Sequence, residues 1–384
     1  MNNLKIKHIA ILLLFTNVLI GQEAFHNLGN VQIHDQGQIG FHIDLINDGD
    51  FDDNLGLAGF YNSNNSLTIS GTNEPIFFDM EVDVSNDLFF QVPTGITNFF
   101  DFINGRIITP RNDIGITLDF RNNGIYSNEG DNTHVDGYVN NAGDLDFRFP
   151  IGDDFRLRTM TVLPLDNTFT LYKAAYFFEN PNSPSTLTGF FNTDLFQNTL
   201  SIISTKEYWD LDGTLPARVT LTWDQQSDIP VLADELSSLR VVGFSTTLNQ
   251  WVNLGNSSFS GTMDSGEITS DVLEPNLYSV ITFGSVLKGN GAITVYTLMS
   301  PNGDGKNDTL IIEGLETSPD NELILFNRWG VEVFRKKNYD NSFAGFSDGR
   351  ATIDGSTELP VGTYFYVLKL KDQKDLAGAF YINR

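Results

Sequence analysis

The chain has 384 residues, no cysteine, and 49 acidic against 23 basic side chains, which gives a formal net charge of −26. Disulfides, thiolate metal sites and cysteine nucleophiles are therefore excluded. Nucleic acid and anionic membrane surfaces are poor partners, since proteins bind both through lysine and arginine. A chain of this length with 31 Phe and 12 Tyr can bury roughly two or three ordinary cores.

Residues 1–21 are predicted to be a secretory signal peptide. Lys5 and Lys7 precede a mostly apolar run over residues 9–20, which ends at the small Gly21. A basic segment, a short apolar segment and a small residue are typical of such peptides. The run is too short to stay in a membrane as a spanning helix. We expect cleavage after Gly21, which leaves a more acidic chain without a transmembrane span.

The remaining sequence has the pattern of an all-β protein. Residues 76–84 and 218–223 alternate between apolar and polar side chains, and clusters of Asn, Asp, Gly and Pro interrupt such segments about every dozen residues. No long segment repeats with the 3.6-residue period of a helix. Residues 232–239 are the one modest candidate for a helix.

Three regions are expected after the signal peptide. In residues 22–148, short strands joined by polar turns favour a small right-handed β-solenoid or a solenoid-like sandwich, because stacked rungs cover one another's faces. A jelly-roll is the alternative. Strand spacing predicts a β-sandwich for residues 149–284, and residues 285–292 read as a linker.

Residues 293–384 combine strand patterns with four successive motifs. Alternating segments separated by Gly or Asp turns predict an Ig-like β-sandwich. The motifs are SPNGDGKND at 300–308, FNRWG at 326–330, LPVGTYFY at 359–366 and GAFYINR at 378–384. This succession resembles the gliding-motility-associated C-terminal domain, which is the type B sorting domain of the type IX secretion system.

The resemblance implies a destination. Such domains direct exported proteins through the periplasm to the cell surface or the medium, and the implied partners are the type IX secretion machinery and a dedicated outer-membrane β-barrel. This sequence departs from the usual pattern where residues 343–346 stand in place of a tryptophan and an insertion runs to Gly355. Within the terminal strand, Gly378, Phe380, Ile382 and Arg384 are the predicted sorting signal, with strand addition at its free edge and recognition of the terminal arginine.

One loop of this region offers a set of oxygen ligands. Its polar residues are Asn302, Asp304, Asn307 and Asp308, and two glycines between them permit tight turns. Calcium favours such ligands, although the spacing differs from an EF-hand and lacks the distal glutamate. The alternative is an Asx-rich turn that begins the first strand of the domain. Calcium is the only cofactor that the sequence suggests.

Other acidic and aromatic residues are expected to be structural. The acidic segments 47–54 and 210–213 and the pair Asp153 and Asp154 are interpreted as solvated turns and strand ends, with cation binding as the alternative. His34 and His42 are expected to be ordinary strand or turn residues rather than zinc ligands. Tryptophans are expected in cores, with stacking on sugars as the alternative.

No motif for catalysis is present, so no catalytic residue is predicted. The sequence lacks a Gly-x-Ser-x-Gly elbow and a phosphate-binding glycine loop, and 49 acidic residues do not single out a glycosidase pair. The expected function is a non-enzymatic secreted or surface protein, adhesin-like or structural. The alternatives are a module that binds glycans or calcium, and a polysaccharide hydrolase with a carboxylate pair.

Overall fold

The computed structural model describes residues 23–197, 199–286, 293–303, 306–315, 318–348, 358–371 and 375–384. The chain divides after Val286 into two compact units, here called the larger unit and the terminal unit. The predicted signal peptide and residues 287–292 of the predicted linker lie outside the described residues. The described chain is all-β, as predicted.

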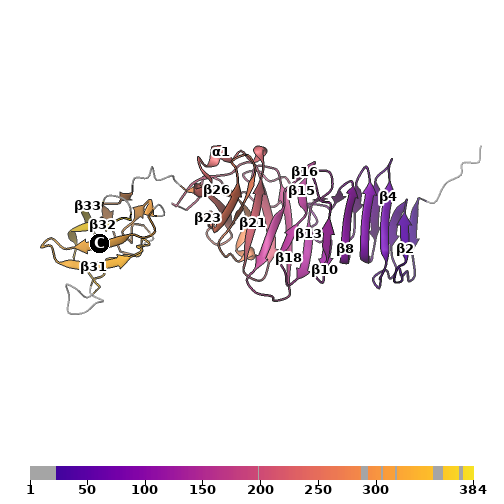
Figure 1. Ribbon diagram of the computed structural model, residues 1–384, viewed down its shortest axis with the longest axis horizontal. Coiled ribbons are helices and arrows are strands. Elements are labelled where there is room, and N and C mark those ends of the chain that lie inside the picture. The colour runs from indigo at the N-terminus through magenta and orange to yellow at the C-terminus, as the bar shows by residue number, and fades with distance from the viewer. Residues whose placement is uncertain are drawn as a thin grey trace, which may run out of the picture. The chain divides into compact units, whose positions relative to one another are not determined.

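The larger unit begins with a β-solenoid, which confirms the prediction for the N-terminal region. Each coil contributes one strand to each of two parallel sheets, so Ala24 lies opposite Asp44 and Leu45 lies opposite Ile69. The first sheet runs in the order β1 (Ala24–Asn27), β3 (Asp44–Asn47), β5 (Leu67–Gly71), β7 (Leu88–Phe90), β9 (Ile107–Ile108), β12 (Val135–Asp136), β15 (Ile151–Asp153) and β16 (Arg156–Leu157). The second begins β2 (Gln38–Phe41), β4 (Leu57–Asn62), β6 (Ile76–Val84), β8 (Thr94–Asn104), β10 (Leu118–Arg121) and β13 (Val139–Gly143), with β11 (Ile125–Ser127) also on β8. Several of these strands are seen side by side in Figure 1.

Phenylalanines from successive coils fill the space between the two sheets. The rings of Phe41 and Phe60 stack with centroids 4.9 Å apart, and those of Phe100 and Phe120 meet edge to face at 6.3 Å. Along β6 the side chains alternate, so that Val82 is fully buried while Glu81 is partly exposed. Burial of one face of each coil against its neighbours explains why a repeat this irregular still folds as a stack.

The acidic segment 47–54 forms a corner where coils stack closely. Asn27 donates its side-chain amide to Asn47 Oδ1 at 2.8 Å, and Asn47 in turn donates to the carbonyl of Asn73 at 3.0 Å. A Cβ on Gly49 would lie 2.1 Å from the carbonyl oxygen of Gly29. Only glycine fits at this corner, because the backbone of the preceding coil occupies the space of a side chain.

An antiparallel β-sandwich continues the second sheet of the solenoid. Strand β13 pairs in parallel with β10 on one side and antiparallel with β18 on the other. The sheet continues through β18 (Thr170–Phe177), β20 (Tyr208–Gly213), β26 (Tyr278–Val286), β22 (Leu239–Ser245) and β23 (Trp251–Asn253), with β19 (Leu200–Ile203) also on β26. A separate sheet contains β14 (Phe147–Phe149), β17 (Met160–Pro164), β21 (Ala217–Trp223), β25 (Gly266–Thr269) and β24 (Ser258–Gly261). The two regions predicted to divide between residues 148 and 149 therefore share a continuous sheet and form one compact unit.

Helical segments in the larger unit are short. They are α1 (Ile229–Leu232) and the 3₁₀ turns η1 (Gln225–Ser227), η2 (Leu236–Ser238) and η3 (Pro275–Leu277). The helix predicted over residues 232–239 is replaced by the end of α1, the turn η2 and the start of β22. Leu239 is fully buried in that strand.

The terminal unit is built on a five-stranded sheet. Its order is β28 (Leu298–Met299), β33 (Leu376–Ile382), β32 (Gly362–Lys369), β30 (Glu322–Phe326) and β31 (Glu332–Lys337), and β27 (Thr294–Val295) pairs separately with β29 (Ile312–Glu313). Its own core includes Leu325, Phe343, Leu368 and Phe380. Phe343 belongs to the segment 343–346 that stands in place of the expected tryptophan, and its ring centroid lies 4.7 Å from that of Phe334. A smaller aromatic ring thus fills the core at the position where the sequence departs from the family pattern.

Candidate functional site

The predicted sorting strand is β33, and its apolar members are core residues. Phe380 and Ile382 are buried. A Cβ on Gly378 would lie 2.5 Å from the hydroxyl oxygen of Tyr366, because the tyrosine ring crosses that position on the neighbouring strand. These three residues build the fold of the terminal unit and do not present side chains to a receptor.

One edge of β33 is partly covered. The N–H groups of Tyr381 and Asn383 donate to the carbonyls of Thr297 and Met299, which belong to the segment around β28. Because N–H groups of an antiparallel strand alternate in direction, those of Ala377 and Ala379 point to the same side. The described residues give these two groups no backbone partner. The free edge predicted for the whole strand is therefore limited to its first half.

Arg384 is folded back onto its own unit. Its Nη1 donates to the carbonyl of Leu359 at 2.7 Å, and its Nη2 donates to the carbonyl of Gly345 at 3.4 Å. The guanidinium also lies 3.6 Å from a carboxylate oxygen of Glu358. The side chain predicted for recognition by a receptor is thus used to fasten the end of the chain.

The proposed calcium loop is held by hydrogen bonds among its own residues. Asp308 Oδ1 accepts from the backbone N–H groups of Asn302 and Gly303, at 3.0 and 2.8 Å. Asn307 has a positive φ of 53°, as turn residues of this type often do. Asp304 lies outside the described residues. These contacts are those of the Asx-rich turn, and calcium binding stays a prediction.

A cluster of three acidic residues in the larger unit lies against two arginines. Among the described residues, Asp136, Asp153 and Asp154 form the one group whose oxygens converge within 4.8 Å. Asp136 accepts from Arg106 at 3.2 Å and from Arg111 at 2.8 Å, and Arg111 lies 3.4 Å from Asp153. Burial raises the pKa of Asp153, and Arg111 opposes that effect. Two guanidinium groups already occupy the place that a cation would take beside Asp136 and Asp153, whereas Asp154 is exposed, as expected for a solvated strand end.

A second buried charge network lies inside the sandwich. Arg158 Nε is 3.3 Å from Glu207, and Arg158 Nη2 is 2.7 Å from Asp224. The hydroxyl of Tyr176 donates to Glu207 at 2.5 Å. Burial raises the pKa of Glu207, while the attraction of Arg158 lowers it. Glu207 is fully closed to solvent, so no substrate can reach this carboxylate in the structure described.

Three of the four tryptophans are core residues, as predicted. Trp209, Trp223 and Trp251 are buried, whereas Trp329 is 72% exposed. The two histidines weighed as zinc ligands are not brought together in any described metal cluster. The ring of His42 lies against that of Tyr61 with centroids 5.5 Å apart.

The segment 210–213, which the sequence predicts to be a solvated turn, lies within strand β20. Asp210 and Asp212 alternate along the strand and so project from the same face. Asp210 accepts from the Tyr138 hydroxyl at 2.7 Å, and Asp212 lies 3.2 Å from Lys173 Nζ. Burial raises the pKa of Asp210 to about 6, and its hydrogen bond from Tyr138 opposes the shift. The alternation of apolar Trp209 and Leu211 with Asp210 and Asp212 is the signal in the sequence that could have identified the strand.

These carboxylates line an open groove of about 600 Å³. Its wall mixes polar and apolar groups. The lining includes Ile114, Asn140, Leu171, Lys173, Thr214, Thr246, Asn276, Tyr278 and Ser279. Sequence reasoning missed this site because its residues come from six separate segments that only the fold brings together.

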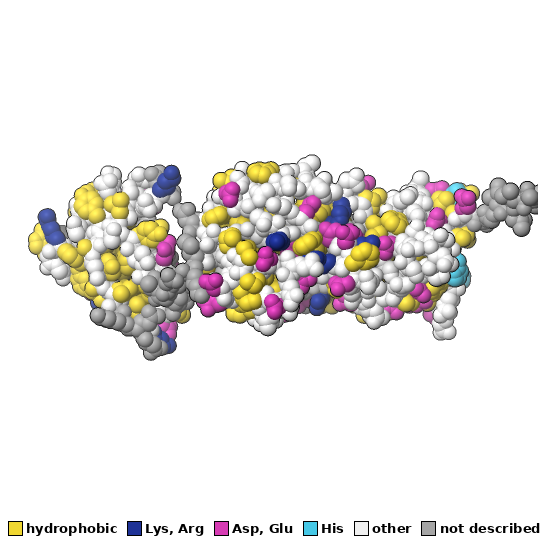
Figure 2. Space-filling model, turned by 90° about the horizontal axis from the view of Figure 1, so that it is seen from above, with side chains coloured by type: hydrophobic (Ala, Val, Ile, Leu, Met, Phe, Trp, Pro, Cys, Tyr) yellow, Lys and Arg dark blue, Asp and Glu magenta, His cyan; other side chains and the backbone are white. Residues whose placement is uncertain are grey.

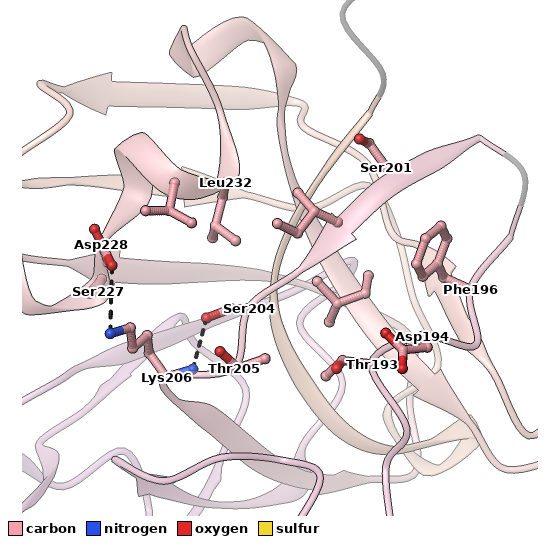
Figure 3. Close-up of a pocket in the computed structure, with 13 residues that line it drawn as sticks. Thr193, Asp194, Phe196, Ser201, Ser204, Thr205, Lys206, Ser227, Asp228 and Leu232 are labelled. Carbon is pink, nitrogen blue, oxygen red and sulfur yellow. Dashed lines mark hydrogen bonds and ion pairs between the residues drawn. The ribbon is translucent and has the colours of Figure 1, made fainter.

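A smaller cavity of about 370 Å³ lies between β19, the loop that precedes it and α1. Figure 3 shows the hydroxyls of Ser201 and Thr205 and the ring of Phe196 around it, with Lys206 and Asp228 at one side. Lys206 Nζ is 3.5 Å from Asp228. Lys206 offsets the charge of Asp228, and Asp194 gives the lining a formal net charge of −1.

The comparisons with known proteins bear on the terminal unit. Residues 293–382 match the family CHU_C, the type IX secretion signal domain. No curated protein and no solved structure matches the chain. In the part of the chain that the structure describes, no helix has the length and apolar character required to cross a membrane. Residues 293–382 are therefore a type IX secretion signal domain, as the motifs predicted, and they mark this chain for secretion or display at the cell surface.

Proposed function

We propose that the larger unit is a non-enzymatic surface or secreted protein, adhesin-like or structural, which the terminal unit delivers through the periplasm and an outer-membrane β-barrel partner. The observation that carries the proposal is that the signal domain at residues 293–382 belongs to the same chain as a β-solenoid. A solenoid offers an extended surface with few constraints on its outward residues, which suits adhesion or scaffolding. On the face of this unit seen in Figure 2, acidic side chains are spread along the surface rather than gathered in one patch.

Delivery is tested with the full chain and with a chain truncated after Val286. Both are expressed in a bacterium with type IX secretion and in a strain that lacks the translocon. We expect protease-accessible or released protein only for the full chain in the competent strain. Equal export of the truncated chain would contradict the role of the terminal unit. Mass spectrometry of the exported protein checks for cleavage after Gly21.

The receptor is proposed to add a strand at the free half of β33. Deleting residues 376–384 would not test this, because the deletion also removes buried Phe380 and Ile382. Ala379→Pro is sharper, since proline removes an outward N–H and is tolerated where a strand edge faces solvent. We expect reduced export with an intact larger unit. Export at the level of the unchanged chain would exclude strand addition at this position.

A second candidate function is saccharide binding in the groove beside β20. Carboxylate, amide and hydroxyl groups there match the donors and acceptors of sugar hydroxyls, and exposed Leu171 and Ile114 offer apolar contact for a sugar face. Lys173 pairs with Asp212, and Asp210 leaves the lining with a formal charge of −1 at neutral pH, which disfavours an anionic saccharide and favours a neutral one.

This candidate is tested by glycan-array binding of the full chain. Asp212→Asn should weaken any bound glycan, whereas Asp228→Asn, in the smaller cavity, should not. Absence of binding on the array would remove the candidate. Hydrolysis of a bound glycan that depends on Asp210 would instead contradict the non-enzymatic proposal, because two carboxylates beside a groove can act as acid and nucleophile or base.

A further inference from the structure

The turn between β30 and β31 in the terminal unit is held rigidly by one side chain. Asn327 Oδ1 accepts from the backbone N–H groups of Trp329 and Val331, each at 3.0 Å. The backbone of Asn327 exchanges hydrogen bonds with Gly330 and Val331, each at 2.9 Å. Gly330 has a φ of +77°, which a side chain would disfavour. The conformation of this tip is therefore fixed before any partner binds.

The tip holds an aromatic ring and a cation in water. The indole of Trp329 is 72% exposed, and the guanidinium carbon of Arg328 lies 4.3 Å from its ring centroid. Arg328 forms no ion pair with a described residue, whereas nearby Arg335 and Lys336 each pair with a carboxylate. An exposed indole gains binding free energy when a partner buries it in an apolar cleft, and a guanidinium gains it from charge-assisted hydrogen bonds to carboxylates.

We propose that the tip formed by residues 327–331 is the side-chain anchor by which the type IX export machinery recognises this domain. The matching surface on the machinery is an apolar cleft bordered by acidic groups. Trp and Arg are the residue types that most often dominate binding energy at interfaces, and a rigid tip loses little entropy on binding. This inference rests on the proposed delivery function, and it locates the contact outside the terminal strand.

The test uses full-length chains in the secretion-competent host. We expect Trp329→Ala to lower the exported fraction about tenfold or more, and Arg328→Gln about threefold or more, as for hot-spot residues. Phe365→Ala is the matched control, because Phe365 is an exposed aromatic of the same unit, 46% exposed on the sheet face. Its export should stay within about twofold of the unchanged chain. Trp329→Tyr should recover much of the loss by keeping an aromatic ring.

Each outcome decides between the hypotheses. Normal export of Trp329→Ala, or an equal loss with Phe365→Ala, would overturn the proposal. A loss of export with Trp329→Ala would also overturn the proposal if the purified full-length variant showed a lower melting temperature for the transition of the terminal unit. An exposed indole should not contribute to the stability of the fold. Failure of the unchanged chain to leave the cell would instead refute the delivery function itself.

Discussion

Residues 23–286 and residues 293–384 carry the same number of basic side chains but use them differently. Residues 23–286 contain 10 Lys and Arg against 36 Asp and Glu, whereas residues 293–384 contain 10 against 13. In the larger unit, Arg106, Arg111 and Arg158 are largely buried and each contacts more than one carboxylate. In the terminal unit, pairs such as Lys371 with Asp320 lie in solvent. The strongly acidic larger unit thus places three of its few basic side chains in buried positions, where a low dielectric strengthens their attraction to carboxylates.

The largest expected effect tests whether the two units unfold independently. Phe120→Ala should destabilise the larger unit by about 3–5 kcal/mol, because it opens a cavity between coils. Phe120 is fully buried and contacts the rings of Phe100, Tyr126 and Phe147. Calorimetry of the full chain should show one shifted transition and one unchanged. Ile125→Ala, at a residue 61% exposed, is the control. A shift of both transitions would show that the units are coupled.

The next effect concerns the buried arginines. Asp136→Asn should cost the larger unit about 3 kcal/mol, because both Arg106 and Arg111 lose a charged partner in a partly buried site. Urea unfolding measures the change. Since these charges are screened little by salt, the loss should persist at high ionic strength. A cost that disappears when salt is added would mean that the cluster behaves as a surface pair.

The acidic character of the larger unit also predicts a pH dependence. Asp210 has a pKa raised to about 6 by burial, against 3.8 for an ordinary aspartate. Between these values the unfolded chain loses the proton and the folded chain keeps it, so Asp210 lowers stability as pH rises from about 4 to about 6. The penalty is complete above that window.

Asp210→Asn should remove this penalty. We expect the variant to be more stable than the unchanged chain at pH 7 by about 1–2 kcal/mol, because the amide oxygen can still accept from Tyr138. The difference between the two unfolding curves should vanish near pH 4. Asp212→Asn, at an exposed neighbour paired with Lys173, is the control. A difference that is constant from pH 4 to 7 would contradict the assignment of the shift to Asp210.

Periodicity and motifs predicted much of this molecule, and the remainder depended on tertiary contacts. Alternation identified β6 with the bounds that the structure gives, and the motif succession identified the terminal unit. The boundary predicted at residue 148 lies within a region joined by one continuous sheet, because β13 pairs with β10 on one side and with β18 on the other. No local sequence pattern contains these long-range pairings. The contacts of Arg384 and the groove beside Asp210 likewise join segments far apart in the sequence.

The smallest expected effect completes the comparison of charges. Lys371 and Asp320 are 2.6 Å apart, but their side chains are 64% and 60% exposed. Water already solvates both groups, so an exposed pair of this kind contributes little to folding. Lys371→Gln should therefore leave the melting transition of the terminal unit without measurable change. A clear loss of stability would mean that the terminal unit, like the larger one, depends on its ion pairs. The contrast between scarce buried arginines and dispensable surface lysines would then have to be abandoned.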